Sequence, residues 1–251
     1  MFIIHPRIKL FYDLREAITP ELALADTYQL MNNINDLSNN SSGWHLPGYS
    51  EEEIRKNHVF NENGITEYAL KEFREIYEYD GRSIIVSLFD KPIIDNPESE
   101  KLENNITYIG QDDIYSNPKR LGKTNTSINL ALEKENFNLK NFIDFIKHLV
   151  SHRYSPFITT ETRGYRLNQK QVFPDRLSAG WMLYLPIEID PTLVPMAEEI
   201  ISISDKNDKK GSLIITTKDI FNIENQEHIN KANDIEICLR DLQILPLMTE
   251  L

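Results

Sequence analysis

The chain has 251 residues, of which 40% are hydrophobic, and this is enough to build one large domain or two small ones. Its formal net charge of −12 disfavours broad contact with nucleic acid phosphates or anionic membranes, and it would attract a cationic partner. No run of about 18 apolar residues is present, so the sequence excludes a membrane-spanning helix.

The compartment follows from cysteine usage and from the start of the chain. Cys238 is the single cysteine, which excludes a disulfide within the chain and is typical of a protein from a reducing cytosol. The short apolar run at the N-terminus is broken by Pro6 and Arg7, unlike a secretory signal. We therefore expect a cytoplasmic protein.

The N-terminal third is predicted to contain one strand followed by three helices. The strand covers residues 7–14, and the first helix begins after Thr19, an N-cap residue with proline next to it. Ser50 and Glu53 form a capping box that predicts a short second helix. Thr66 begins a third helix with apolar residues at helical spacing.

The rest of the chain is predicted to alternate strands with two helices. A helix is expected over 138–152 and another over 224–243, which Pro246 would end, and Leu242 is expected to face inward. The tract 203–216 is predicted to form a turn that leads into a strand. The other predicted strands cover residues 83–89, 106–110, 127–133, 156–162 and 180–188.

This order of elements predicts the fold class. Helices that cluster early and strands that follow indicate an α+β fold, with a mainly antiparallel sheet packed with helices from the N-terminal third and the C-terminus. We expect a single domain over residues 1–251, with any subdivision near residues 90–135.

The stretch GWHLPGYS, residues 43–50, has the glycine and serine spacing of a phosphate-binding loop, but Tyr49 stands in the place of the lysine. Pro47 has no N–H group to donate to a phosphate, and the three glutamates that follow would repel one. We interpret the stretch as a connector between two helices, in which Trp44 and Leu46 pack inward.

Other residues that could carry chemistry are few. His148 and His152 have the i, i+4 spacing of a helical zinc site, but no third ligand is evident, so two solvated histidines are the competing interpretation. Cys238 is expected to pack within the last helix, and His228 to make a capping or other hydrogen bond. We predict no catalytic residue, metal or cofactor. A metal-dependent hydrolase using the two histidines remains the alternative, and a small-ligand or scaffold module is a third interpretation.

Two regions carry a resemblance to a known family. The first is LSNNSSGWHLPGYSEEEIRKNHVF at 37–60, and the second runs from DRLSAGWMLYLP at 175–186 to HINKANDIEICLRDLQILP at 228–246. Together they resemble the immunity protein 52 family of bacterial polymorphic-toxin systems. Residues 90–135 carry no assignable match, and Phe89 stands where the resemblance would place a tryptophan.

The resemblance implies a function in contact-dependent or type VI secretion. Such a protein would bind and neutralise a cognate toxin, often a nuclease with a restriction-endonuclease-like fold, without a cofactor. An acidic surface could shield the basic DNA-binding face of a nuclease by mimicking the phosphate track. Occluding the metal site of the toxin, or locking the toxin in an inactive form, would fit equally well.

The candidate partner-binding residues are exposed acids, although charged residues are usually only a solvated surface. Trp181, Tyr184, Ala232 and Ile235 have the spacing of core residues and are not expected to contact a partner. The acids predicted to bind the toxin are Glu51, Glu52, Asp112, Asp113, Glu227 and Asp234.

Overall fold

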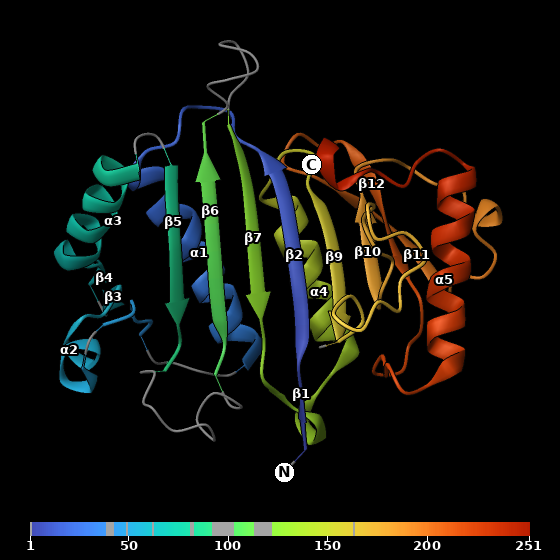
Figure 1. Ribbon diagram of the computed structural model, residues 1–251, viewed down its shortest axis with the longest axis horizontal. Helices are drawn as coiled ribbons and strands as arrows, with labels where there is room; N and C mark the ends of the chain where they lie inside the picture. The colour runs from blue at the N-terminus through green and yellow to red at the C-terminus, as the bar shows by residue number, and fades with distance from the viewer. Residues whose placement is uncertain are drawn as a thin grey trace. The chain divides into compact units, whose positions relative to one another are not determined.

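The computed structural model describes residues 2–38, 43–48, 50–61, 63–80, 83–91, 103–112, 122–162 and 164–251. The chain divides into two compact units, the first made of Met1–Ile4 and Asp13–Phe145 and the second of His5–Tyr12 and Ile146–Leu251. The main sheet strands number three in the first unit and five in the second, and neighbouring strands within each unit are antiparallel (Figure 1). The predicted α+β class is therefore confirmed, whereas the single domain stays a prediction.

The first unit is built on β5 (Ser83–Phe89), β6 (Asn105–Gln111) and β7 (Lys123–Asn129), which pair in that order. Alternation along each strand sends apolar side chains such as Val86 and Ile106 to one buried face. Helix α1 (Pro20–Ser38) lies behind these strands, and α3 (Glu67–Asp80) packs against α1 and β5 (Figure 1). The smaller elements are β1 (Ile3–Ile4), α2 (Glu51–Lys56), β3 (Phe60–Asn61), β4 (Gly64–Ile65), β8 (Leu132–Glu133) and η2 (Lys134–Asn136).

The predicted starts of the three N-terminal helices are confirmed by their caps. Thr19, Ser50 and Thr66 each precede a helix, and the hydroxyl of each accepts the backbone N–H of the residue three positions later, at 3.1–3.2 Å. Each bond satisfies one of the N–H groups that a helix start leaves without an intrahelical acceptor.

The stretch GWHLPGYS connects α1 to α2, as predicted. Trp44 and Leu46 are buried, and the indole N–H of Trp44 donates to the side-chain oxygen of Asn35 at 3.0 Å. Between them, His45 donates its N–H to the carbonyl of Phe89 at 2.8 Å and accepts the N–H of Phe89 at 3.0 Å. The connector thereby pairs with one end of β5, the edge strand of the first unit.

The second unit contains five strands in the order β11-β12-β10-β9-β2. One face of them packs against α5, where Ile235 and Leu239 join a buried cluster with Leu183, Leu185 and Ile214. The strands are β2 (Pro6–Asp13), β9 (Phe157–Thr162), β10 (Met182–Leu185), β11 (Glu199–Ser204) and β12 (Lys210–Ile215), and the helical segments are α5 (Gln226–Asp241), η3 (Pro191–Leu193) and η4 (Met248–Glu250). Helix α4 (Leu139–Ser151) has residues in both units.

Two predicted strands need correction, and one strand of the structure was not predicted. The strand predicted at 127–133 begins earlier, at Lys123, and ends at Asn129, because β7 has one open face that accepts polar residues. The strand at 180–188 is shorter and ends at Leu185, directly before a proline. Strand β11 was not predicted, because the turn-forming residues from Asp205 to Gly211 indicated a turn and the apolar residues just before them were not recognised as a strand.

The last helix also ends earlier than predicted. It stops at Asp241, and Gln243 adopts a left-handed conformation with φ of 60°, which turns the chain before Pro246 is reached. Leu242 therefore does not continue the buried stripe of the helix, and it is 36% exposed instead of facing inward. The four positions Ile229, Ala232, Ile235 and Leu239 are buried as predicted.

Candidate functional site

Two of the predicted acids of the first unit, Glu52 and Asp112, have partners within the chain. Glu52 forms an ion pair with Lys56 one turn later, with 2.5 Å between Oε1 and Nζ. Asp112 accepts the N–H of Ile18 at 2.9 Å, so its carboxylate holds the chain ahead of α1. Glu51 begins α2, and Asp113 lies outside the described residues.

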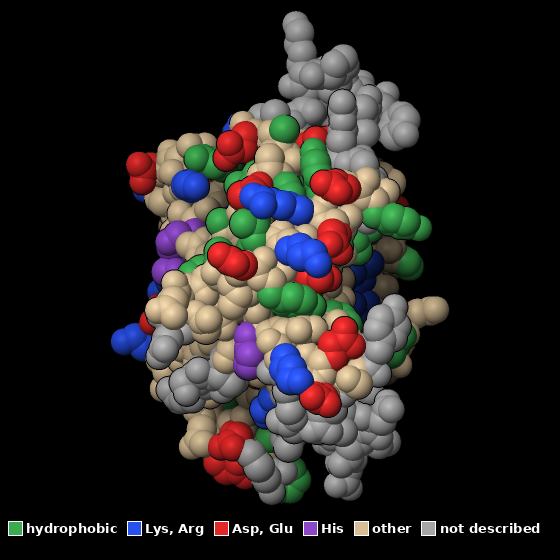
Figure 2. Space-filling view, turned by 90° about the vertical axis from the view of Figure 1, so that its left-hand side faces the viewer, with side chains coloured by type: hydrophobic (Ala, Val, Ile, Leu, Met, Phe, Trp, Pro, Cys, Tyr) green, Lys and Arg blue, Asp and Glu red, His purple; other side chains and the backbone are tan. Residues whose placement is uncertain are grey.

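The face of the first unit around α3 has mixed charge. Arg74 pairs with Glu21 at 2.7 Å, and Lys71 pairs with Glu75 at 3.4 Å. Figure 2 shows acidic and basic side chains interspersed on this side of the molecule. Because opposite charges alternate there, the described part of this face offers no extended field of one sign.

The inner face of α5 carries a buried carboxylate that organises the second unit. Glu236 has no exposed surface; its Oε1 accepts the hydroxyl of Tyr165 and the N–H of Ala179, both at 3.0 Å, and its Oε2 accepts the N–H of Val172 at 2.8 Å. Burial raises the pKa of Glu236, and the backbone donors oppose that rise. This network ties the segment 165–179 to α5 and so fixes the position of the helix.

The residues that carry the family resemblance in this unit have structural roles. His228 accepts the N–H of Asn222 on Nδ1 at 3.0 Å, which confirms its predicted hydrogen-bonding role. The indole N–H of Trp181 donates to the carbonyl of Thr217 at 3.1 Å. Four residues of the resemblance that were predicted to pack in the core are fully buried: Trp181, Tyr184, Ala232 and Ile235.

The outer face of α5 carries a row of carboxylates. Glu227 and Asp234, both predicted as partner-binding residues, are exposed and seven positions apart, and Asp241 continues the row. A helix drifts by only about 20° over seven residues, so the three side chains project in nearly the same direction. At a rise of 1.5 Å per residue, neighbours in the row are roughly 10.5 Å apart along the axis.

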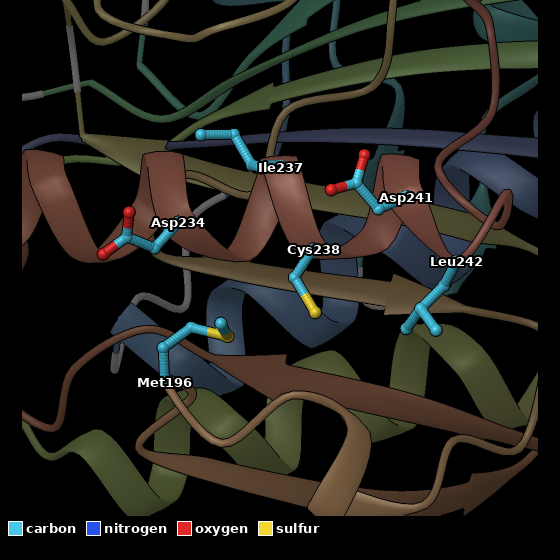
Figure 3. Close-up of a pocket in the computed structure, with 6 residues that line it drawn as sticks. All are labelled: Met196, Asp234, Ile237, Cys238, Asp241 and Leu242. Carbon is cyan, nitrogen blue, oxygen red and sulfur yellow. The ribbon is translucent and has the colours of Figure 1, made fainter.

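A shallow groove of about 450 Å³ lies on this outer face, between α5 and the segment after η3 (Figure 3). Ile237 and Leu242 contribute apolar surface that is 38% and 36% exposed. The sulfur atoms of Met196 and Cys238 lie between Asp234 at one end and Leu242 at the other (Figure 3). The residues that line the groove are Met196, Asp234, Ile237, Cys238, Asp241 and Leu242.

The charges around the groove differ in how strongly they are compensated. Asp241 pairs with Arg240, with 2.7 Å between Oδ1 and the nearer guanidinium nitrogen. Lys231, on the same helix, pairs with Glu198 at 2.8 Å. Among the described residues, no ion pair or hydrogen bond involves the carboxylate of Asp234 or Glu227. The groove therefore combines an apolar floor with a negative border.

The thiol of Cys238 forms part of the apolar wall. Its Sγ–H donates to the carbonyl of Leu193 at 3.1 Å. Burial raises the pKa of the thiol, and the charge of Asp241 raises it further. Because the thiolate is disfavoured, Cys238 reacts slowly with electrophiles and contributes to the groove mainly as a small apolar group.

The two histidines of the alternative metal site lie close together at the end of α4, with their rings tilted by 37°. Their rings are 4.0 Å apart, and Nδ1 of His152 lies 2.9 Å from the carbonyl of His148. Across the described ranges, no group of three or more His, Cys, Asp or Glu residues could hold a metal ion. Nor does any helix in those ranges have the length and apolar character needed to cross a bilayer.

Comparison with known proteins gives one kind of match. No protein-family model and no curated protein matches the sequence. Among solved structures, the fold is similar to Pseudomonas aeruginosa T6SS protein PA0821, with a TM-score of 0.54 over 95% of this chain and 72% of that chain. The likeness is one of fold. At 8% identity, the likeness does not indicate that the two proteins share surface residues.

The sequence predicted two acids on the outer face of α5, Glu227 and Asp234, but it did not predict the groove beside them. The pattern Asp-x-x-Ile-Cys-x-x-Asp from Asp234 to Asp241 was the available signal, because it places two apolar residues between acids one heptad apart. The contribution of Met196 could not be inferred, because it comes from a segment far from α5 in the sequence.

Proposed function

We propose that this protein is an immunity protein that binds and neutralises a cognate secreted bacterial toxin. The supporting observation is the fold likeness, over 95% of the chain, to a protein named for the type VI secretion system. The immunity protein 52 resemblance points the same way, and four residues within it, Trp181, Tyr184, Ala232 and Ile235, are buried as fold-maintaining residues would be. Neutralisation would proceed by tight binding, without catalysis and without a cofactor.

A nuclease with a restriction-endonuclease-like fold is the toxin class that the family resemblance favours. A nuclease presents a basic face to its substrate, and this chain has a formal net charge of −12. Residues 177–251, which include α5, contribute 13 acidic and 6 basic side chains. Complementary charge of this kind raises the association rate and selects against acidic partners.

The spacing of the acids on α5 favours a mixed interface over mimicry of DNA. Duplex DNA carries one charge per roughly 1.7 Å of axis, which amounts to about 12 charges over the roughly 21 Å between Glu227 and Asp241. Helix α5 offers three carboxylates in that length, about a quarter of the density. We therefore propose that the apolar groove supplies the anchor and that the acids steer and orient the toxin.

Co-expression with a candidate nuclease toxin from a neighbouring gene tests the proposal. We expect protection from growth arrest and co-purification of the two proteins, and an inactive toxin variant should co-purify equally well. Failure of both protection and co-purification would contradict the immunity function. Stoichiometric zinc in the purified protein would instead favour a metal-dependent hydrolase at His148 and His152.

A further inference from the structure

The groove on α5 has a spacing that specifies the shape of its occupant. We propose that it binds a basic amphipathic helix of the partner, in which two adjacent apolar residues are flanked by Lys or Arg one heptad apart. This inference rests on the proposed immunity function and names the part of the toxin that would be recognised. The occupant would carry the pattern Lys-x-x-Leu-Leu-x-x-Lys or its arginine equivalent.

The pattern on α5 supplies the template. Asp234 and Asp241 border the groove, and Ile237 and Cys238 occupy the third and fourth positions between them. A helix packed along α5 repeats its own side chains every seven residues at nearly the same angle. Its two cations can therefore meet both carboxylates while the apolar pair between them contacts the floor of the groove.

An extended strand does not satisfy the same geometry. The carboxylates are roughly 10.5 Å apart along the helix axis, a distance that a strand covers in about three residues. Residues three positions apart in a strand project to opposite faces, so one of two cations at that spacing would point away. A helical occupant places both cations on the same side.

The floor and the border of the groove can adapt to such a helix. Met196 is unbranched and flexible, so it can fill gaps around an aliphatic side chain. The pair between Asp241 and Arg240 has side chains that are 61% and 43% exposed, and exposed pairs of this kind contribute little to stability. Asp241 can therefore exchange Arg240 for a cation of the partner.

A second copy of this chain is a poorer occupant. Helix α5 of another copy would bring acids against acids. Helix α4 does carry Lys140 and Lys147 one heptad apart, but Asp144 stands between them where an apolar residue is needed. Charge complementarity therefore favours a different protein with a basic helix.

The test uses the full-length protein and designed helical peptides. The probe is an alanine–glutamine helix that carries Lys-x-x-Leu-Leu-x-x-Lys, and its controls are the same residues in permuted order and the same helix with Glu for Lys. Alkylation of Cys238 followed by mass spectrometry reports on the groove, because this is the only cysteine of the chain. We expect the alkylation rate to fall in proportion to the fraction of protein bound to the probe, and not with either control peptide.

Charge reversal provides the matched variants. The double variant Asp234→Lys/Asp241→Lys should weaken probe binding by about 10- to 100-fold and should bind the Glu peptide instead. Glu16→Lys/Glu135→Lys makes the same formal change at exposed acids of the first unit, and it should leave probe binding within about twofold. Circular dichroism of each variant verifies that the fold is kept.

Several outcomes would overturn the assignment of the groove. If the permuted peptide protects Cys238 equally well, the proposed heptad spacing of the occupant is wrong. If the protein self-associates and this protects Cys238 without any peptide, the occupant is a second copy of the chain. If Asp234→Lys/Asp241→Lys still neutralises the toxin as well as wild type does, the groove is not the toxin-binding site. The proposed immunity function would not be affected by that result. Probe binding together with failed neutralisation would overturn the immunity function and leave the groove assigned to a basic helix.

Discussion

The two faces of α5 use carboxylates in opposite ways. On the inner face, Glu236 is fully buried and accepts three hydrogen bonds that tie a distant segment to the helix. On the outer face, Asp234 is exposed and borders an apolar groove. The same type of side chain therefore stabilises the fold on one face of the helix and is open to solvent on the other.

Replacing Glu236 with alanine should have the largest effect on stability. The change leaves the N–H groups of Val172 and Ala179 without their acceptor, and the hydroxyl of Tyr165 keeps only the side-chain oxygen of Asn233. Each donor that loses its acceptor in the interior costs about 1–3 kcal/mol, so the free energy of unfolding should fall by about 2–5 kcal/mol. Chemical denaturation monitored by circular dichroism measures the loss.

The matched control for that variant is on the same helix. Asp234→Ala removes a carboxylate that makes no described hydrogen bond, so the unfolding free energy should change by less than about 0.5 kcal/mol. If Asp234→Ala and Glu236→Ala lowered the free energy of unfolding equally, the inner carboxylate would not be the one that stabilises the fold.

The apolar part of the outer face should dominate partner affinity. Ile237→Ser exchanges an exposed apolar side chain of the groove for a polar one, and we expect toxin affinity to fall by about 10- to 30-fold, as for a hot-spot residue. Ile85→Ser makes the same exchange at a residue of β5 that is 48% exposed, and it should leave affinity unchanged. Isothermal titration calorimetry with inactive toxin compares the two, and equal effects would remove the groove from the interface.

The acidic part of the outer face should act mainly on the association rate. Asp234→Asn/Asp241→Asn removes two border charges, so association with the toxin should slow by about 3- to 10-fold at low salt with little change in dissociation. The difference from wild type should disappear near 1 M salt, where the screening length falls to about 3 Å. Stopped-flow fluorescence measures both rates; a salt-independent loss would mean that these acids make direct buried contacts.

Buried and exposed carboxylates should also differ in the pH dependence of stability. Glu161 on β9 is buried and accepts the N–H of Arg166 at 3.1 Å, and burial raises its pKa. Its stabilising contribution is thus complete below the unfolded-state pKa of about 4.3, and it is lost as the pH rises through the folded-state pKa. The stability difference between wild type and Glu161→Gln should therefore decrease as the pH rises.

The exposed counterpart is Glu198, whose pKa is lowered by its hydrogen bond to Lys231. Its contribution is present above the unfolded-state pKa and is lost as the pH falls through the lower folded-state value. Urea unfolding of Glu161→Gln and Glu198→Gln between acidic and neutral pH should give slopes of opposite sign relative to wild type. Slopes of the same sign would contradict the contrast between buried and exposed carboxylates.

Local signals in the sequence predicted most of the helices, because their starts are encoded within a few residues. Thr19, Ser50 and Thr66 each cap a helix at the predicted position. Strand limits were less accurate, since pairing partners determine where a strand ends and are not visible locally. Strand β11 exists because it pairs with β12 over six residues, although turn-forming residues follow it directly.

The candidate site was predicted in part for the same reason. Glu227 and Asp234 could be assigned to the outer side of α5 from helical periodicity alone. The exposure of Leu242 depends on where the helix ends, and that is determined by the left-handed backbone of Gln243 rather than by Pro246. Met196 joins the groove through tertiary packing, which no local pattern encodes.

The connector at His45 has a consequence for handling the protein. Strand β5 has the sequence SIIVSLF, which is uncharged, rich in β-branched residues and free of proline, as in segments that form intermolecular sheets. His45 occupies both backbone groups of Phe89, so that end of the edge strand cannot accept a strand from another molecule. Truncating the buried side chain of Trp44 would weaken the packing that holds His45 against Phe89. We expect such a variant to aggregate during expression rather than to lose binding.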